Sequence, residues 1–176
     1  IPRALLGIAE LGLHHEQQHQ ELILTDVKHA LAQNPLRPAY RAPRAGPRAA
    51  AAAAAPPRFT DWPGGIVAIG HEGEGFAFDN EGPRHRRWLE PFALATRLVT
   101  NGEWLAFMED DGYRRPELWL SDGLDTVERE GLEAPGYWER DGRSWLHFTF
   151  EGLRPVDPAE PVCHVSHYEA DAFARW

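Results

Sequence analysis

The first 33 residues carry a helical pattern of apolar and polar positions. The leucines along this stretch fall at near-heptad spacings, at Leu6, Leu13, Leu24 and Leu31. Pro2 suits a first helical turn, and Pro35 would end the helix. The pattern therefore predicts one long helix from about Pro2 to Gln33. A lone helix of this length is not stable by propensity alone, so its apolar face needs partners.

The periodic pattern stops after this helix. Residues 36–60 consist largely of Pro, Ala, Arg and Gly, and they include the low-complexity run Ala49–Ala55. Such a composition is typical of a solvated, semi-rigid connector between domains. We expect an interdomain linker at 36–60, with no site on it.

Residues 61–176 alternate short strand patterns with turns and helix starts. Strands are expected at Ile66–Ile69, which reads as buried, at Trp88–Leu89, at Phe92–Leu94, and on both sides of a hairpin turn at Asp141–Gly142. Helices are expected after the capping boxes Thr100–Glu103 and Ser166–Glu169, and over Ser121–Glu130 with a stop at Gly131. The mixture predicts an α+β fold.

Charge and composition narrow the class of protein. The net charge is −9, with +3 on the first 58 residues and −12 on the remainder. An acidic segment of this kind argues against non-specific nucleic-acid binding, which requires cations that neutralise phosphates. Cys163 is the single cysteine, so no internal disulfide can form.

No apolar run approaches the roughly 18–20 residues of a membrane span, and no signal peptide is visible. We therefore expect a cytoplasmic protein that does not enter a membrane. The sequence opens without Met and stops inside a helical pattern. It reads as a fragment that is cut at both ends.

The candidate chemistry lies on the first helix. His15 and His19 are four residues apart, which places them on one helix face with Cβ atoms about 5–6 Å apart. Two such imidazoles can converge on one metal ion at about 2.0–2.1 Å each. Imidazole suits Zn, Fe, Cu and Ni, so the pair predicts a metal without choosing it. His14 points about 100° away from His15 and is interpreted as a structural or surface residue.

The run from His15 to His19 also matches the H-E-x-x-H pattern of zinc hydrolases, with Glu16 as general base. A hydrolase of this kind needs a third ligand. The longer metzincin motif requires Gly and His where this chain has Leu22 and Thr25, so that form fails. The short match alone is weak evidence for a protease.

Two further clusters have simple structural interpretations. Asp79–Glu81 and His85 are best explained by a hydrogen-bonded turn, with a calcium or substrate site as the alternative. Cys163 lies beside His164 and close to His167, but no third residue that would orient a catalytic pair is evident.

Several motifs occur together along the chain. They are His15–Leu22, Thr25–Asp26, Gly64–Gly65, Phe76–Glu81, Pro83–His85, Val99–Glu103, Gly112–Arg114 and Pro161–Ser166. In these motifs the chain resembles the ergothioneine-biosynthesis sulfoxide synthases (EgtB type) and the related selenoneine synthases. The resemblance implies that residues 1–35 are the terminal, iron-binding helix of a DinB-like four-helix bundle. It implies that residues 61–176 are the first half of a formylglycine-generating-enzyme-like domain, which has a C-type-lectin-like fold.

The resemblance also implies a chemistry. Its cofactor is non-haem Fe(II), with His15 and His19 as two of three histidine ligands and the third upstream of this sequence. Gln18 matches the residue that helps to hold the imidazole of trimethylhistidine (hercynine). O₂ and a thiol, either γ-glutamylcysteine or cysteine, are the other substrates, and the sulfur is joined to the imidazole C2 and oxidised to a sulfoxide.

The family's catalytic Tyr and remaining substrate residues match positions past Trp176. We therefore expect no catalytic residue within these 176 positions and no turnover by this stretch alone. Three alternatives stay open: a selenoneine synthase that uses a selenosugar, an H-E-x-x-H zinc hydrolase, and a lectin-like binding module without catalysis. The sequence does not indicate an oligomeric state.

Overall fold

The computed structural model describes residues 2–43 and 55–176. Their contacts divide them into two compact units. Unit 1 contains the described residues up to His29 together with Pro57–Thr96, and unit 2 contains those from Ala30 to Pro56 together with Arg97–Trp176. Both units are made of helices and small antiparallel sheets, which confirms the α+β prediction.

Helix α1 runs from Arg3 to Gln33, as the leucine spacing predicts. Leucines along its length are largely exposed, with values of 47% for Leu11, 70% for Leu13, 55% for Leu22 and 46% for Leu24. The apolar face that was expected to be buried is therefore not covered by the residues that the structure describes. No helix among those residues is long and apolar enough to cross a membrane.

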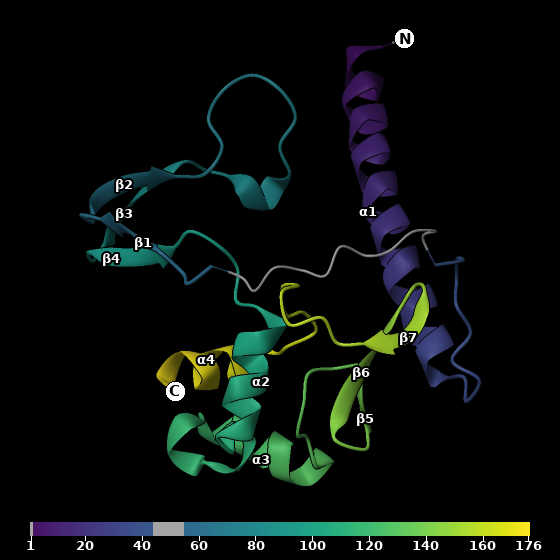
Figure 1. Cartoon of the computed structure of the whole chain (residues 1–176). Helices are drawn as coiled ribbons and strands as arrows, with labels where there is room; N and C mark the ends of the chain where they lie inside the picture. Colours follow the sequence, from purple (N-terminus) through teal and green to yellow (C-terminus); the bar gives the residue numbers. More distant parts are fainter. Residues whose placement is uncertain (1, 44–54) are drawn as a thin grey trace. The chain divides into compact units, whose positions relative to one another are not determined.

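Two antiparallel ladders form the β-structure of unit 1 (Figure 1). One pairs β1 (Phe59–Trp62) with β4 (Phe92–Ala95), and the other pairs β2 (Gly65–Ile69) with β3 (His85–Leu89). The strands expected from the sequence are present, but the expectation that Ile66–Ile69 is buried is wrong. Ile66 is 66% exposed and Ile69 44% exposed, because β2 belongs to a two-stranded ladder that no second described layer covers.

Unit 2 combines three α-helices with a three-stranded sheet (Figure 1). The helices are α2 (Asn101–Glu109), α3 (Ser121–Glu130) and α4 (His167–Arg175), with short 3₁₀ turns η2 (Gly112–Arg114) and η3 (Pro116–Leu118) between α2 and α3. The antiparallel sheet has the order β5 (Trp138–Asp141), β6 (Ser144–Thr149), β7 (Gly152–Pro155).

The helix starts of unit 2 follow from local side-chain chemistry. The Thr100 hydroxyl accepts a hydrogen bond from the Glu103 backbone N–H at 3.3 Å, and the Glu103 carboxylate accepts one from the Thr100 N–H at 2.9 Å. Ser166 and Glu169 make the same reciprocal pair at 3.2 and 2.6 Å. Both capping boxes are confirmed, and each satisfies two N–H groups that a helix start leaves without intrahelical partners.

The core of unit 2 lies between its helices. It is an aromatic-rich cluster of buried side chains: Trp104, Phe107, Tyr113, Leu118, Trp119, Val127 and Ala172. Phe173 of α4 stacks on Trp104 of α2, with ring centroids 4.9 Å apart and an interplanar angle of 9°. Offset stacking of this kind contributes about 0.5–1.5 kcal/mol beyond the area that it buries.

The first residues after α1 lie against the β5–β7 sheet. The backbone N–H groups of Tyr40 and Arg41 donate to the Phe150 carbonyl at 2.9 and 3.0 Å, and the Arg37 side chain donates to Glu139 Oε1 at 2.7 Å. Most of the Ala49–Ala55 run falls outside the described residues. The domain boundaries at residues 35–36 and 60–61 stay predictions.

Candidate functional site

His15 and His19 project from neighbouring turns of α1, and both side chains are exposed. Their ring centroids are 4.5 Å apart and their planes stand at 89° to each other. If each imidazole bound a metal at about 2.0–2.1 Å with an angle near 90° between the two bonds, the centroids would be about 4.6 Å apart. The observed centroid spacing is close to this value, and in the structure the two rings form a T-shaped contact on one helix face.

As a metal site, the pair would supply two ligands. Among the residues that the structure describes, no group of three or more His, Cys, Asp or Glu side chains is arranged to hold a metal ion. A third protein ligand is therefore not found within the described ranges 2–43 and 55–176.

Gln18 is exposed on the same helix. It follows His15 by three residues and His14 by four, so both histidines are its neighbours on the helix surface. Its amide has a donor and an acceptor end, which suits a neutral heteroaromatic ring nitrogen.

His14 lies beside a loop of unit 1 and is half-buried, unlike His15 and His19. Its ring stacks on Phe76 with centroids 3.9 Å apart and an interplanar angle of 18°. The structural interpretation of His14 therefore agrees with the geometry. Because Phe76 is distant in sequence, no local pattern indicated this contact.

The acidic cluster next to Phe76 forms a tight turn, η1 (Asp79–Glu81). The Glu81 carboxylate accepts a hydrogen bond from the Phe78 N–H at 2.7 Å, and Asp79 Oδ1 accepts one from the Asn80 N–H at 3.0 Å. These backbone hydrogen bonds agree with the hydrogen-bonded turn expected from the sequence.

Around Cys163 the histidines contact aromatic rings. His164 packs edge-on against Tyr137, with centroids 4.7 Å apart, and His167 contacts Tyr168 at 5.7 Å. Cys163 is exposed and has no hydrogen-bond partner among the described residues. The geometry gives no support to a Cys–His catalytic pair.

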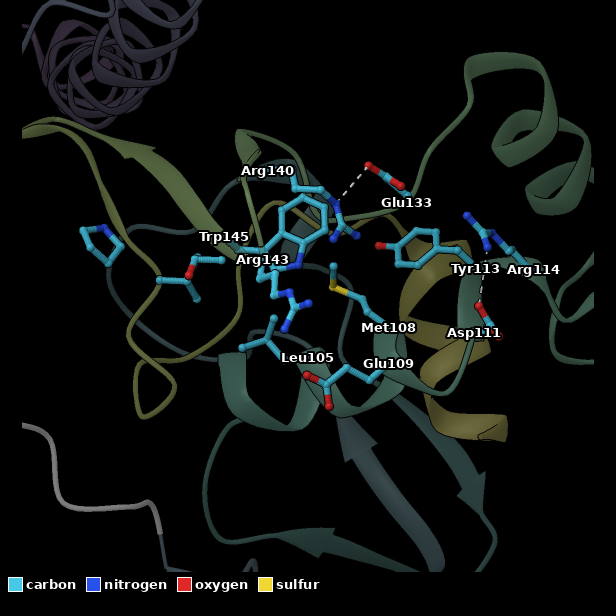
Figure 2. A pocket seen from close by; sticks show the side chains of 13 residues that line it. Leu105, Met108, Glu109, Asp111, Tyr113, Arg114, Glu133, Arg140, Arg143 and Trp145 are labelled. Atoms are coloured by element: carbon cyan, nitrogen blue, oxygen red, sulfur yellow. Dashed lines mark ion pairs between the residues drawn. The ribbon is translucent and has the colours of Figure 1, made fainter.

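Unit 2 has an open cavity of about 570 Å³ that the sequence did not indicate (Figure 2). Leu105 and Met108 of α2 line it, opposite Trp145 of the β5–β6 hairpin. The Arg140 guanidinium lies 4.6 Å from the centre of the Trp145 ring, a cation–π contact, and 3.9 Å from Glu133.

Most of the charged side chains that line this cavity form ion pairs with one another. Arg140 faces Glu133, and Arg114 lies 3.7 Å from Asp111 (Figure 2). These surface pairs are exposed, so each contributes little to stability. The cavity is a neutral cleft, and none of the residues expected to bind metal or substrate line it.

Comparison with known proteins identifies the class of protein. Residues 47–176 match the sulfatase-modifying factor enzyme 1-like domain, and the chain belongs to this family. It is 37% identical to the hercynine oxygenase of Mycobacterium tuberculosis over 111 residues, which are 63% of this chain and 26% of that protein. It is 36% identical over 111 residues to the hercynine oxygenase of Mycolicibacterium thermoresistibile, covering 63% of this chain and 24% of that protein.

A second group of relatives carries a different name. The formylglycine-generating enzyme of Streptomyces coelicolor is 34% identical over 152 residues, which are 75% of this chain and 48% of that protein. The resemblance to the ergothioneine-type synthases predicted from the motifs is confirmed by the hercynine oxygenase matches. The alignments span about a quarter of the length of those relatives.

Proposed function

We propose that the protein is an iron-dependent hercynine oxygenase that forms a C–S bond in ergothioneine biosynthesis. The observation that carries this proposal is the right-angled His15–His19 pair, with ring centroids 4.5 Å apart, in a chain whose relatives include three hercynine oxygenases. In this proposal residues 1–35 are the last helix of a DinB-like bundle, 36–60 are a linker, and 61–176 are the first half of a lectin-like domain.

The proposed reaction joins a thiol to C2 of the hercynine imidazole and oxidises the sulfur. One thiol S–H and one imidazole C–H bond are broken, and O₂ supplies one oxygen atom to the sulfoxide and one to water. Atoms and electrons therefore balance with O₂ as the sole oxidant. Fe(II), when bound, supplies the site at which O₂ and the thiol are activated.

In this proposal the residues of this chain hold the metal and orient the substrate. In it, His15 and His19 bind the metal through neutral ring nitrogens, the form of imidazole that acts as a metal ligand. Gln18 hydrogen-bonds the substrate imidazole and sets its C2 toward the thiol. Such positioning removes much of the entropic cost of bringing two substrates together.

The experiment uses the intact protein, purified without oxygen and loaded with Fe(II). We expect close to one iron per chain, O₂ uptake that requires both hercynine and a thiol, and a sulfoxide product by mass spectrometry. A selenosugar in place of the thiol tests the selenoneine alternative. Zinc with peptidase activity, or no bound metal, would refute the proposal in favour of a hydrolase or a binding module.

A further inference from the structure

The loop between β2 and β3 contacts α1 through three aromatic rings. Phe76 stacks on His14 at 3.9 Å, and Phe78 packs edge-on against Phe76 at 4.8 Å and lies 6.4 Å from His14. Phe76–Phe78 are half-buried while their immediate neighbours in the loop are exposed, and His14 is half-buried on an otherwise exposed stretch of helix. The loop is therefore covered where it meets α1.

Hydrogen bonds within the loop fix its shape. At its base the His71 N–H donates to the Glu81 carbonyl at 2.7 Å, and Arg84 donates to the Gly70 carbonyl at 3.3 Å. Arg84 also pairs with Glu72 at 3.1 Å. A loop whose base is closed in this way is compact, so a contact at Phe76 restrains the segment between its two closed ends.

The position of His14 on the helix determines which helix residues lie next to the loop. Gln18 lies one turn beyond His14 on the same flank, and His15 lies about 100° further round. A loop seated on His14 therefore stands next to Gln18, on one side of the face that carries His15 and His19.

We propose that Phe76 is a positioning residue, which by stacking on His14 holds the Gly70–Gly82 loop as one wall of the substrate site beside Gln18. This inference rests on the proposed function, because it assigns the wall to a substrate that Gln18 binds. It assigns no metal contact to the loop.

The test compares Phe76→Leu, which keeps apolar bulk without a ring, with Phe76→Tyr, which keeps the stack. Phe92→Leu is the matched control, since Phe92 stacks on Trp62 at 6.2 Å in the β1–β4 ladder. We expect Phe76→Leu to bind iron normally and to raise the Kd and the KM for hercynine about tenfold, with kcat changed less than about twofold. Phe76→Tyr and Phe92→Leu stay within about twofold of wild type.

Hydrogen exchange supplies a readout that is independent of turnover. In the protein without metal or substrate, Phe76→Leu speeds amide exchange at residues 71–81 and Phe92→Leu does not. In the Fe(II)-loaded protein, hercynine slows exchange of this loop in wild type and in Phe76→Tyr, but not in Phe76→Leu.

The outcomes separate the two proposals. Unchanged loop exchange in Phe76→Leu, an unchanged hercynine Kd, or loss of iron from this variant would each overturn the positioning role. A wild-type protein that binds neither iron nor hercynine refutes the proposed function itself, whatever the loop does.

Discussion

The hydroxyl of Tyr113 donates a 2.6 Å hydrogen bond to Glu169 Oε1, and both residues are 5% exposed. The same hydroxyl accepts a longer hydrogen bond from Trp104 Nε1 at 3.4 Å, and the other Glu169 oxygen caps α4 through the Ser166 N–H. The contact joins η2 to α4 across the core of unit 2. A buried carboxylate is tolerated there because each of its oxygens has a donor.

Removing the hydroxyl tests this account. Tyr113→Phe leaves Glu169 Oε1 without its donor, and we expect the free energy of unfolding to fall by about 1–3 kcal/mol. Tyr168→Phe is the matched control, since the partly buried Tyr168 hydroxyl has no hydrogen-bond partner among the described residues. Urea denaturation of both variants measures the difference. Equal losses would show that the hydrogen bond to Glu169 is not responsible.

The same hydrogen bond predicts that the protein loses stability at high pH. Burial, and then the neighbouring Glu169 carboxylate, raise the pKa of Tyr113 above its usual value of about 10. Because the folded-state pKa is the higher one, the stabilisation is fully present below about pH 10 and is lost as the pH rises through the folded-state pKa. Denaturation midpoints between pH 8 and pH 11.5 should fall steeply above pH 10 in wild type and less steeply in Tyr113→Phe. Parallel curves would contradict the assignment.

An ion pair at the start of α2 predicts a corresponding loss of stability at low pH. Arg97 donates two 2.8 Å hydrogen bonds to the Glu103 carboxylate, and this contact is the main reason that the pKa of Glu103 is lowered to about 2. The stabilisation is therefore present above the usual pKa of Glu, about 4.3, and is lost as the pH falls toward 2. The two side chains are 24% and 31% exposed, so solvent screening holds the effect to about 1 kcal/mol.

Glu103→Gln tests the predicted loss of stability at low pH. The amide keeps the shape of the cap but cannot titrate, so we expect lower stability at pH 7 and a flatter stability curve between pH 4.5 and pH 2. Glu128→Gln, the same substitution at an exposed position on α3, is the control. A Glu103→Gln curve that stays parallel to wild type between pH 4.5 and pH 2 would rule out the ion pair as the source.

Local signals in the sequence specify most of the helices and turns. The Thr100–Glu103 and Ser166–Glu169 capping boxes and the stop at Gly131, where φ is +63°, each depend on residues a few positions apart. The His15–His19 pair is local in the same sense, because i and i+4 positions of a helix are neighbours whatever surrounds them.

The features that the sequence patterns did not predict depend on contacts between residues that are distant in the sequence. Strand β7 was not among the strands expected from the sequence, and its Pro155 is accommodated because β7 is the edge of its sheet. Strand β1 was not expected either: it crosses the predicted boundary between linker and domain at residues 60–61, and Phe59–Trp62 becomes a strand through pairing with β4. The His14–Phe76 stack was likewise out of reach, because nothing near either residue specifies the other.

The metal assignment predicts different results for adjacent residues. His15→Ala or His19→Ala each removes one of the proposed ligands, so we expect iron loading of the intact protein to be abolished. Glu16→Ala should leave iron loading largely intact, because Glu16 lies about 100° from His15 round the helix. Metal analysis after anaerobic purification decides the matter, and normal iron content in His19→Ala would refute the ligand assignment.

Two helical glycines predict opposite effects of one substitution. A Cβ atom at Gly123 of α3 would lie 2.7 Å from the Tyr168 Cβ, whereas one at Gly12 of α1 would meet nothing within 4 Å. Ala is favoured over Gly inside a helix by about 1 kcal/mol, but overpacking a core costs about 1–3 kcal/mol. We therefore expect Gly12→Ala to raise the helicity of α1 and Gly123→Ala to lower the free energy of unfolding of unit 2 by up to about 2 kcal/mol. Circular dichroism and urea denaturation measure the two effects, and stabilisation by Gly123→Ala would show that α3 and α4 do not pack as closely as this contact requires.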